Sequence, residues 1–287
     1  MATPGTQIWV AAGTYFPSLC KHCTQSDRNE SFKVPSGVAV YGGFAGNETT
    51  IQERKIRQNP TQLSGHIGSD NQFDNSRTVV LFENASNETI LDGFTITGGL
   101  ADNKEAGDGH ASRSGGAIYN IATNENKSNP TIKNCLFFEN TAAEGGAIFN
   151  YCENGVANIT AINCTFLKNK AVNAGGAVME HSKSQLNHSV FKSCKFINNT
   201  SRFGGGFFTS NANPVAEIFE NCTFINNESE YGAAAFISAK EKGNFYNQNC
   251  TFKGNKSKDE KAIYYQQRNN LNEAIRETLN VKSGVSL

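Results

Sequence analysis

Apolar and polar residues recur along this chain with a period of about 30 residues. Each copy opens with a Gly-Gly-Ala-Ile phrase or a close variant, as at residues 115–118, and closes with Cys-x-Phe-x-x-Asn, as at residues 135–140. The five cysteines of the closing phrases are separated by 29, 30, 28 and 28 residues. A repeat of this length predicts stacked structural units rather than a single globular core.

Short β-strands are predicted within each unit. The cysteine and phenylalanine of Cys-x-Phe lie two positions apart and therefore share one face of a strand, while the residue between them is mostly polar and faces outward. No apolar pattern at helical spacing spans a unit. We therefore predict an all-β fold, a single-stranded parallel β-helix whose coils stack about 4.8 Å apart. We expect it to be right-handed, because parallel connections usually are.

Equivalent residues of successive units are expected to form ladders along the β-helix. The cysteines and phenylalanines would line the interior, with the thiols buried and free, and the asparagines would bond to their copies at a turn. The Gly-Gly pair fits a second turn, where a Cβ would be costly. The predicted structural ladders are Cys135, Cys164, Cys194, Cys222 and Cys250, and Asn140, Asn169, Asn199, Asn227 and Asn255.

The chain is expected to form one β-helix domain over residues 1–287. We expect irregular N-terminal coils with loops at residues 1–90 and regular repeats at residues 91–265. A helix at residues 269–282 would cap the last coil. The N-terminus shows neither a comparable cap nor a signal-peptide pattern, so we expect the natural protein to continue upstream.

A disguised first repeat is predicted at residues 91–99, with Phe94 in the cysteine position, Ile96 in the phenylalanine position and Gly99 in the asparagine position. The next cysteine, Cys135, follows Phe94 by 41 residues. The excess length is a charged insertion at residues 101–114, which we expect to be an exposed loop.

Composition narrows the function classes. Lys+Arg and Asp+Glu number 26 each, so the chain lacks the basic footprint of a nucleic-acid-binding protein. The chain contains no run of 18 apolar residues, so the sequence predicts no transmembrane helix. Cys20 and Cys23 form a Cys-x-x-Cys in a polar loop, for which a local disulfide is the first interpretation. Free thiols, or half of a metal site with His22, are the alternatives.

The Gly-Gly-Ala-Ile and Phe-x-x-Asn phrases at this spacing resemble the repeats of chlamydial-type polymorphic outer membrane proteins. Phrases at residues 8–15, 40–46 and 91–99 resemble right-handed β-helix surface proteins of environmental and gut bacteria. The resemblance extends to about residue 265 and implies the β-helix fold. Chlamydial-type members are surface-exposed adhesins, so it also implies a secreted or cell-surface, outer-membrane-associated protein. The expected partner is a glycan or a surface protein of a host or neighbouring cell.

An enzyme is the main alternative, because polysaccharide lyases and glycoside hydrolases use the same fold. They would need clustered acidic residues, or a Ca²⁺ site together with a basic residue. No acidic column repeats along this chain, so we expect a binding module without a cofactor and keep Ca²⁺ as the alternative. A structural spacer within a larger surface protein is the third interpretation.

Two short polar clusters are the best catalytic candidates that the sequence offers. One contains Glu180, His181 and Lys183 together with His188, and the other contains Asp108 and His110 together with Arg113. Carboxylate and imidazole groups are common general acids and bases. The simpler interpretation places both clusters in solvated surface loops without a catalytic role.

A column of mostly aromatic residues is the predicted ligand-binding surface. Neighbouring residues of a strand face opposite ways, so we assign the Ile column inward and the following column outward. An outward stripe of this kind could stack on sugars or dock a partner. The alternative is that a loop of each coil folds over the column and buries it. The column comprises Tyr119, Phe149, Met179, Phe208, Phe236 and Tyr264.

Overall fold

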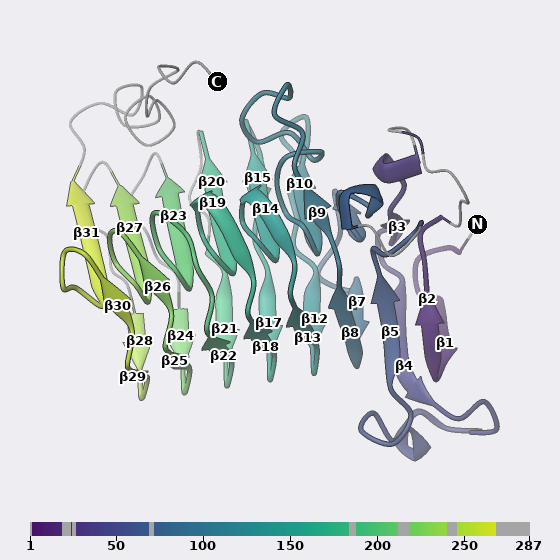
Figure 1. The fold of residues 1–287 in the computed structure, drawn as a ribbon. Coiled ribbons are helices and arrows are strands. Elements are labelled where there is room, and N and C mark those ends of the chain that lie inside the picture. The colour runs from purple at the N-terminus through teal and green to yellow at the C-terminus, as the bar shows by residue number, and fades with distance from the viewer. Residues whose placement is uncertain are drawn as a thin grey trace.

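The computed structural model describes residues 2–18, 24, 27–68, 72–183, 188–211, 218–239 and 246–267. Over these residues the chain winds into a parallel β-solenoid of about eight turns with almost no helix (Figure 1). Each turn adds one strand to each of three long sheets, which we call sheets A, B and C. The predicted all-β parallel β-helix is confirmed.

Sheets A and B flank the cysteine column, with one strand before and one strand after the cysteine of each repeat. Sheet A contains β1 (Gln7–Ala11), β4 (Ala39–Phe44), β7 (Ile90–Asp92), β12 (Thr131–Lys133), β17 (Thr160–Ile162), β21 (Val190–Lys192), β24 (Ile218–Glu220) and β28 (Tyr246–Gln248). Sheet B contains β2 (Gly13–Tyr15), β5 (Thr61–Ser64), β8 (Phe94–Thr97), β13 (Leu136–Phe138), β18 (Thr165–Leu167), β22 (Lys195–Ile197), β25 (Thr223–Ile225) and β29 (Thr251–Lys253).

Sheet C follows the Gly-Gly pair and positions the candidate functional residues. It contains β3 (Phe32–Lys33), β6 (Val80–Glu83), β10 (Ile118–Ala122), β15 (Ile148–Cys152), β20 (Val178–Ser182), β23 (Phe207–Asn211), β27 (Ala235–Ala239) and β31 (Ile263–Gln267).

Smaller elements complete the described turns. The short strands are β9 (Leu100–Ala101), β14 (Thr141–Glu144), β19 (Lys170–Ala174), β26 (Glu228–Ser229), β30 (Lys256–Ser257), β11 (Lys127–Ser128) and β16 (Val156–Ala157). The short 3₁₀ helices are η1 (Asp27–Asn29), η2 (Ile51–Glu53) and η3 (Gln72–Asp74).

Ladders of equivalent phenylalanines fill the interior. Phe137, Phe166 and Phe196 stack with ring centroids 4.8 and 4.7 Å apart. The ladder continues through Phe224 and Phe252 at 4.6 and 5.1 Å. These spacings match the distance between paired strands, so each ring lies over its copy in the next turn. The predicted phenylalanine column is confirmed.

The cysteine column also lies in file inside the solenoid. Cys135, Cys164, Cys194 and Cys222 are buried and Cys250 is half-buried, and all five have free thiols. Their sulfurs lie within hydrogen-bonding distance of backbone carbonyl oxygens of neighbouring strands. The expected ladder of free thiols is confirmed.

The asparagine column forms a continuous hydrogen-bonded ladder. The Nδ2 of Asn140 donates to Oδ1 of Asn169 at 3.1 Å, and Asn169 donates in the same way to Asn199. The ladder continues through Asn227 to Asn255. The left-handed backbone at this corner falls on the residue before each asparagine rather than on the asparagine itself.

The Gly-Gly pairs form the turn that leads into sheet C. The first glycine has a positive φ, 68° at Gly115 and 59° at Gly145, a conformation that favours glycine. A Cβ on the second glycine, Gly116, would lie 2.7 Å from the carbonyl oxygens of Gly146 and Thr141. The predicted glycine turn is confirmed.

The disguised first repeat has the predicted register. Ile96 pairs with Phe137, which places Phe94 in the cysteine column, and Gly99 donates its N–H to Asn140 Oδ1 at 3.1 Å. The expected capping helix at residues 269–282 and the Cys20–Cys23 disulfide lie outside the described residues. Within the described part of the chain, no helix is long and apolar enough to cross a membrane.

Candidate functional site

The predicted ligand-binding column faces away from the main core but is covered. Tyr119, Phe149, Met179, Phe208 and Phe236 are each at most 4% exposed, and they form a second apolar cluster. Tyr264, at the end of this column, is half-buried and stacks on Phe236. The expectation of an exposed stripe is therefore wrong, and the column instead has the burying cover that was the alternative. Ligand binding by these residues stays a prediction.

The segment that follows each asparagine provides the cover. Ala174, at the end of β19, is fully buried in the aromatic cluster. Phe203, the equivalent residue of the next turn, packs against the same cluster. Phe203 contacts Phe236 edge-on with centroids 5.4 Å apart. Because the segment recurs in every repeat, the column is covered along the regular coils rather than at one point.

Glu180 points into the solenoid and is fully buried. It continues an internal polar ladder, in which Asn120 Nδ2 donates to Asn150 Oδ1 and Asn150 Nδ2 donates to Glu180 Oε1, both at 3.1 Å. A substrate in solvent could not reach this carboxyl. The interpretation of Glu180 and His181 as a solvated loop tip is also wrong, because both residues belong to β20 and are buried.

His181 lies on the outer face of sheet C, since it neighbours Glu180 on the same strand. Its ring stacks on Tyr151, with centroids 5.8 Å apart and planes 2° apart. Both rings line a cleft of about 180 Å³, which we call the Glu144 cleft. Its lining residues are Asp108, Gly109, Glu144, Phe149, Tyr151, Met179, His181 and Lys183.

Buried hydrogen bonds fasten the insertion to the solenoid. The Tyr119 hydroxyl donates to the carbonyl oxygen of Gly109 at 2.6 Å. Glu144 Oε2 accepts from the Gly109 N–H at 3.1 Å and from the Ser114 hydroxyl at 3.0 Å. The expected exposed loop is therefore partly wrong, because Gly109, Ser112 and Ser114 are buried against the coils.

The side chain of Glu144, which is 1% exposed, lies near both a positive and a negative side chain of the insertion. Arg113 lies between two carboxylates, with Nη2 3.1 Å from Asp108 Oδ1 and Nε 3.8 Å from Glu144 Oε1. Burial raises the pKa of Glu144, the nearby Asp108 adds to the rise and Arg113 opposes it. The arrangement places a buried carboxyl with a raised pKa beside the more exposed carboxyl of Asp108.

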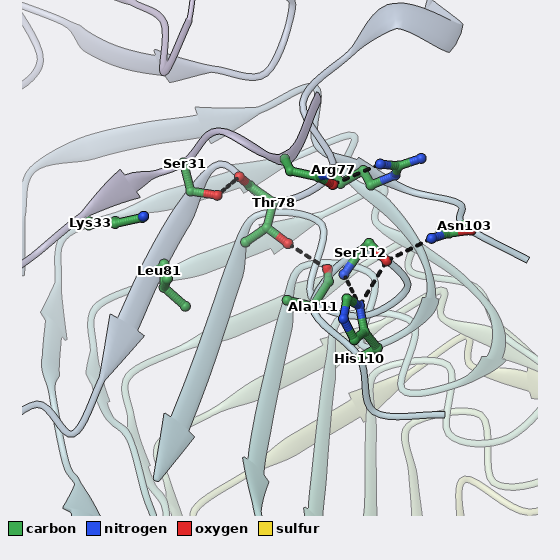
Figure 2. Close-up of a pocket in the computed structure, with 10 residues that line it drawn as sticks. Ser31, Lys33, Arg77, Thr78, Leu81, Asn103, His110, Ala111 and Ser112 are labelled. Atoms are coloured by element: carbon green, nitrogen blue, oxygen red, sulfur yellow. Dashed lines mark hydrogen bonds between the residues drawn. The ribbon is translucent and has the colours of Figure 1, made fainter. Parts of the chain in front are cut away.

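A second and larger hollow lies on the other side of the insertion. This hollow, which we call the insertion pocket, has a volume of about 370 Å³. Figure 2 shows that its lining comes from three segments, around β3, β6 and the insertion. The lining residues are Asn29, Ser31, Lys33, Arg77, Thr78, Leu81, Asn103, His110, Ala111 and Ser112.

The structure separates the four catalytic candidates. Asp108 and His181 meet in the Glu144 cleft, His110 lines the insertion pocket, and Glu180 lies inside the solenoid. Within the described residues, no three His, Cys, Asp or Glu side chains come together to hold a metal ion. The Ca²⁺ alternative therefore has no ligands assigned to it and stays a prediction.

One turn of the solenoid carries a signature shared with a known family. Residues 134–151 match the Chlamydia polymorphic membrane protein (PMP) repeat. The matched segment runs from the corner before the cysteine through β13 and β14 into β15. Searches of curated proteins and of solved structures gave no significant match. The PMP repeat and the solenoid agree with a PMP-like β-helix, and this family suggests a surface or outer-membrane-associated protein.

The sequence predicted few of the residues that line the two hollows of this PMP-like solenoid. Arg77 and Lys33 lie in the irregular N-terminal coils, where no repeat column marks them. Glu144 stands before a Gly-Gly pair, in a column whose other members are Ser114, Ala174, Phe203 and Tyr231. An acid at a position that is otherwise small or apolar was the available signal, and it indicated a local role rather than a repeated one.

Proposed function

We propose that this chain is a cell-surface β-solenoid module that binds a glycan of another cell, in the manner of an adhesin. The observation that carries the proposal is the insertion at residues 101–114. It is fastened across the outer face of sheet C and creates a hollow on either side of itself. Binding sites on a rigid scaffold are commonly built by such inserted loops.

The size and chemistry of the hollows favour a glycan over a protein partner. Volumes of about 370 and 180 Å³ suit a small group or a few sugar units. Their linings combine hydroxyl, amide and charged groups with Tyr151 and Leu81, which suits the polar and apolar faces of a sugar ring. A protein partner would need a contact area of roughly 800 Å² on each side.

An enzyme is the second candidate, because Glu144 with its raised pKa shares a cleft with the Asp108 carboxylate. Such pairs serve general acid and base catalysis. The contacts of Glu144 favour a fastening role, since Oε2 already accepts two hydrogen bonds from the insertion. Incubation with acidic and neutral polysaccharides in the presence of Ca²⁺ separates the two functions, because release of unsaturated or reducing-end products would contradict a pure binder.

Adhesion of beads coated with this chain to cultured cells tests the proposal. We expect adhesion that is lost after the cells are treated with glycosidases and retained after mild protease treatment. The double variant Lys33→Ala/Tyr151→Ala changes one residue in each hollow and should reduce adhesion. Lys195→Ala/Tyr246→Ala changes the same residue types at exposed positions on sheets B and A and should not.

Two results would reject the proposal. Adhesion that is lost after protease treatment but retained after glycosidase treatment would identify a protein partner instead of a glycan. Equal adhesion by both double variants would show that the hollows beside the insertion are not the binding site.

A further inference from the structure

One oxygen of the buried Glu144 carboxyl has no hydrogen-bond partner among the described residues. Its Oε2 accepts from Gly109 and Ser114, whereas Oε1 lies 3.8 Å from Arg113 Nε, which is longer than a hydrogen bond. The side chain is 1% exposed and lines the Glu144 cleft. Because a buried polar atom without a partner is costly, this oxygen indicates a ligand group that supplies one.

Two apolar side chains from neighbouring turns line the cleft together with this carboxyl. Phe149 and Met179 are paired in the register of β15 and β20, and both are buried. Neither side chain can form a strong hydrogen bond. Such a surface suits a methyl group better than a hydroxyl, because a hydroxyl placed against it would lose its hydrogen bonds to water.

Tyr151 forms an aromatic wall of the cleft. Its ring is half-buried and stacks on Phe149 and His181, with centroid distances of 6.0 and 5.8 Å. A Cβ on Gly109 would lie 3.3 Å from Tyr151 Cε2, so the backbone of the insertion packs closely on the same ring. A ligand therefore meets a wall that is already held in position. An aromatic side chain is a suitable contact for the apolar face of a sugar ring.

The charged groups at the cleft are already paired within the protein. Asp108 Oδ1 lies 3.1 Å from Arg113 Nη2, and Lys183 Nζ donates to Glu153 Oε1 at 2.9 Å. A ligand with a full charge would have to compete with one of these pairs. A neutral ligand has no such cost, and the carboxylate and the ammonium group can each form a further hydrogen bond with it. The cleft therefore favours a neutral group that both donates and accepts.

We infer that the Glu144 cleft binds a sugar that carries an acetamido group. The acetamido methyl would contact Phe149 and Met179, and the N–H would donate to Glu144 Oε1. The carbonyl oxygen would accept from Lys183 Nζ, and the sugar ring would pack against Tyr151. The volume of about 180 Å³ suits one sugar unit with its substituent, since sites for larger ligands span roughly 300–1,000 Å³. This inference rests on the proposed glycan binding and specifies its ligand class.

Calorimetric titration with three matched trimers tests the inference. Chitotriose, the corresponding trimer of glucosamine, and cellotriose share one backbone and linkage. They carry an acetamido, an ammonium and a hydroxyl group, respectively, at the same ring position. We expect chitotriose to bind and the other two to bind about tenfold or more weakly, because they lack the amide hydrogen bonds and the buried methyl group.

Saturation-transfer NMR shows which part of the bound sugar lies against the protein. Ligand protons closest to the protein receive the most saturation, so the acetamido methyl of chitotriose should receive more than the ring protons. A methyl signal with less saturation than the ring protons would overturn the placement of the methyl group on Phe149 and Met179.

Two variants with matched controls place the binding in the cleft. Lys183→Ala should weaken chitotriose binding by about tenfold, because it removes a charged donor. Lys168→Ala should not, although Lys168 also pairs with a glutamate of the preceding turn and lies over an aromatic ring. Tyr151→Ala should weaken binding at least as much, whereas Tyr246→Ala, at an exposed position on sheet A, should leave it unchanged. Circular dichroism spectra and thermal midpoints show whether each variant has kept its fold.

Each contrary result has its own meaning. Binding of cellotriose or the glucosamine trimer as tight as that of chitotriose would overturn the acetamido preference. Equal losses in Lys183→Ala and Lys168→Ala would overturn the cleft as the site. Absence of chitotriose binding, with adhesion to cells that is still sensitive to glycosidases, would overturn this inference and leave the proposed function standing. Failure of both tests would overturn both.

Discussion

Each asparagine of the interior ladder serves two neighbouring turns at once. Asn169 Nδ2 donates to Asn199 Oδ1 and to the Phe137 carbonyl oxygen, while its Oδ1 accepts from the side chain and the backbone of Asn140. The residue is fully buried, so water cannot replace a lost partner. The asparagine at this position of each repeat is therefore required by the hydrogen bonds of buried groups, in addition to the apolar packing of the core.

Asn169→Ala should therefore lower the free energy of unfolding by about 2–4 kcal/mol, because it leaves several buried groups without partners. Chemical denaturation monitored by circular dichroism measures the change. Asn163→Gly is the matched control, because Asn163 is exposed and has a positive φ of 54° that glycine adopts without strain. A loss in Asn169→Ala no larger than in this control would show that the ladder contributes little to stability.

The buried thiols give a second prediction at the residue scale. Burial raises the pKa of Cys135 to about 12, so its reactive thiolate is rare in mildly alkaline solution. In a Cys20→Ser/Cys23→Ser variant, we expect the ladder thiols to resist Ellman's reagent in the folded state and to react after denaturation. Cys250 should react first, because it is half-buried. Rapid reaction of every thiol in the folded protein would contradict the interior ladder.

At the scale of elements, one buried acidic residue helps to hold the insertion in position. Glu144, at the end of β14, binds the Gly109 backbone and the Ser114 side chain and faces Arg113. Its raised pKa means that the folded protein holds this proton more tightly than the unfolded chain does. The carboxyl therefore contributes most stability below its usual pKa, and this contribution is lost as the pH rises through the raised value.

Glu144→Gln should remove that dependence. We expect the wild-type protein to lose stability relative to Glu144→Gln as the pH rises above about 4.5, the ordinary value for this group. Thermal unfolding midpoints measured across this pH range show the difference. Glu88→Gln removes an exposed carboxylate, and its curve should run parallel to that of the wild type. Parallel curves for Glu144→Gln and the wild type would contradict a raised pKa at Glu144.

At the scale of the molecule, each turn packs mainly on the turns directly before and after it. Phe196 stacks on Phe166 and Phe224 at 4.7 and 4.6 Å, and its strand β22 pairs with β18 and β25. In such an architecture stability is close to a sum over turns and their interfaces. A substitution that destabilises one turn should therefore also destabilise the adjacent turns, with less effect on more distant ones.

Phe196→Ala should destabilise the chain by about 3–5 kcal/mol, since it empties a fully buried ring position. Hydrogen exchange should show the greatest loss of protection in the strands of sheet B that contain Phe166 and Phe224. Protection in β4 and β7, several turns away, should change much less. A uniform loss across the whole chain would contradict this nearest-neighbour behaviour.

Most of the architecture could be predicted because the repeat encodes it residue by residue. A two-residue alternation assigns Cys and Phe to the interior, and stacking at a fixed period places each over its copy, as the Phe137 and Phe166 rings confirm. The same alternation correctly turned Tyr119 and its column away from the main core. It could not show that the segment containing Ala174 folds back over that column, since alternation is local to a strand.

The sequence by itself determined the parallel solenoid, its ladders and its glycine turns, because those features depend on contacts between equivalent positions of neighbouring repeats. The tertiary structure alone decided where the insertion lies and which side chains meet beside it. The fastening bond between Gly109 and Glu144 joins residues 35 positions apart, and Ser31 and Thr78, which help to shape the insertion pocket, are 47 apart. Neither pair belongs to a repeated column, so no period in the chain relates them. Only the folded path brings them together.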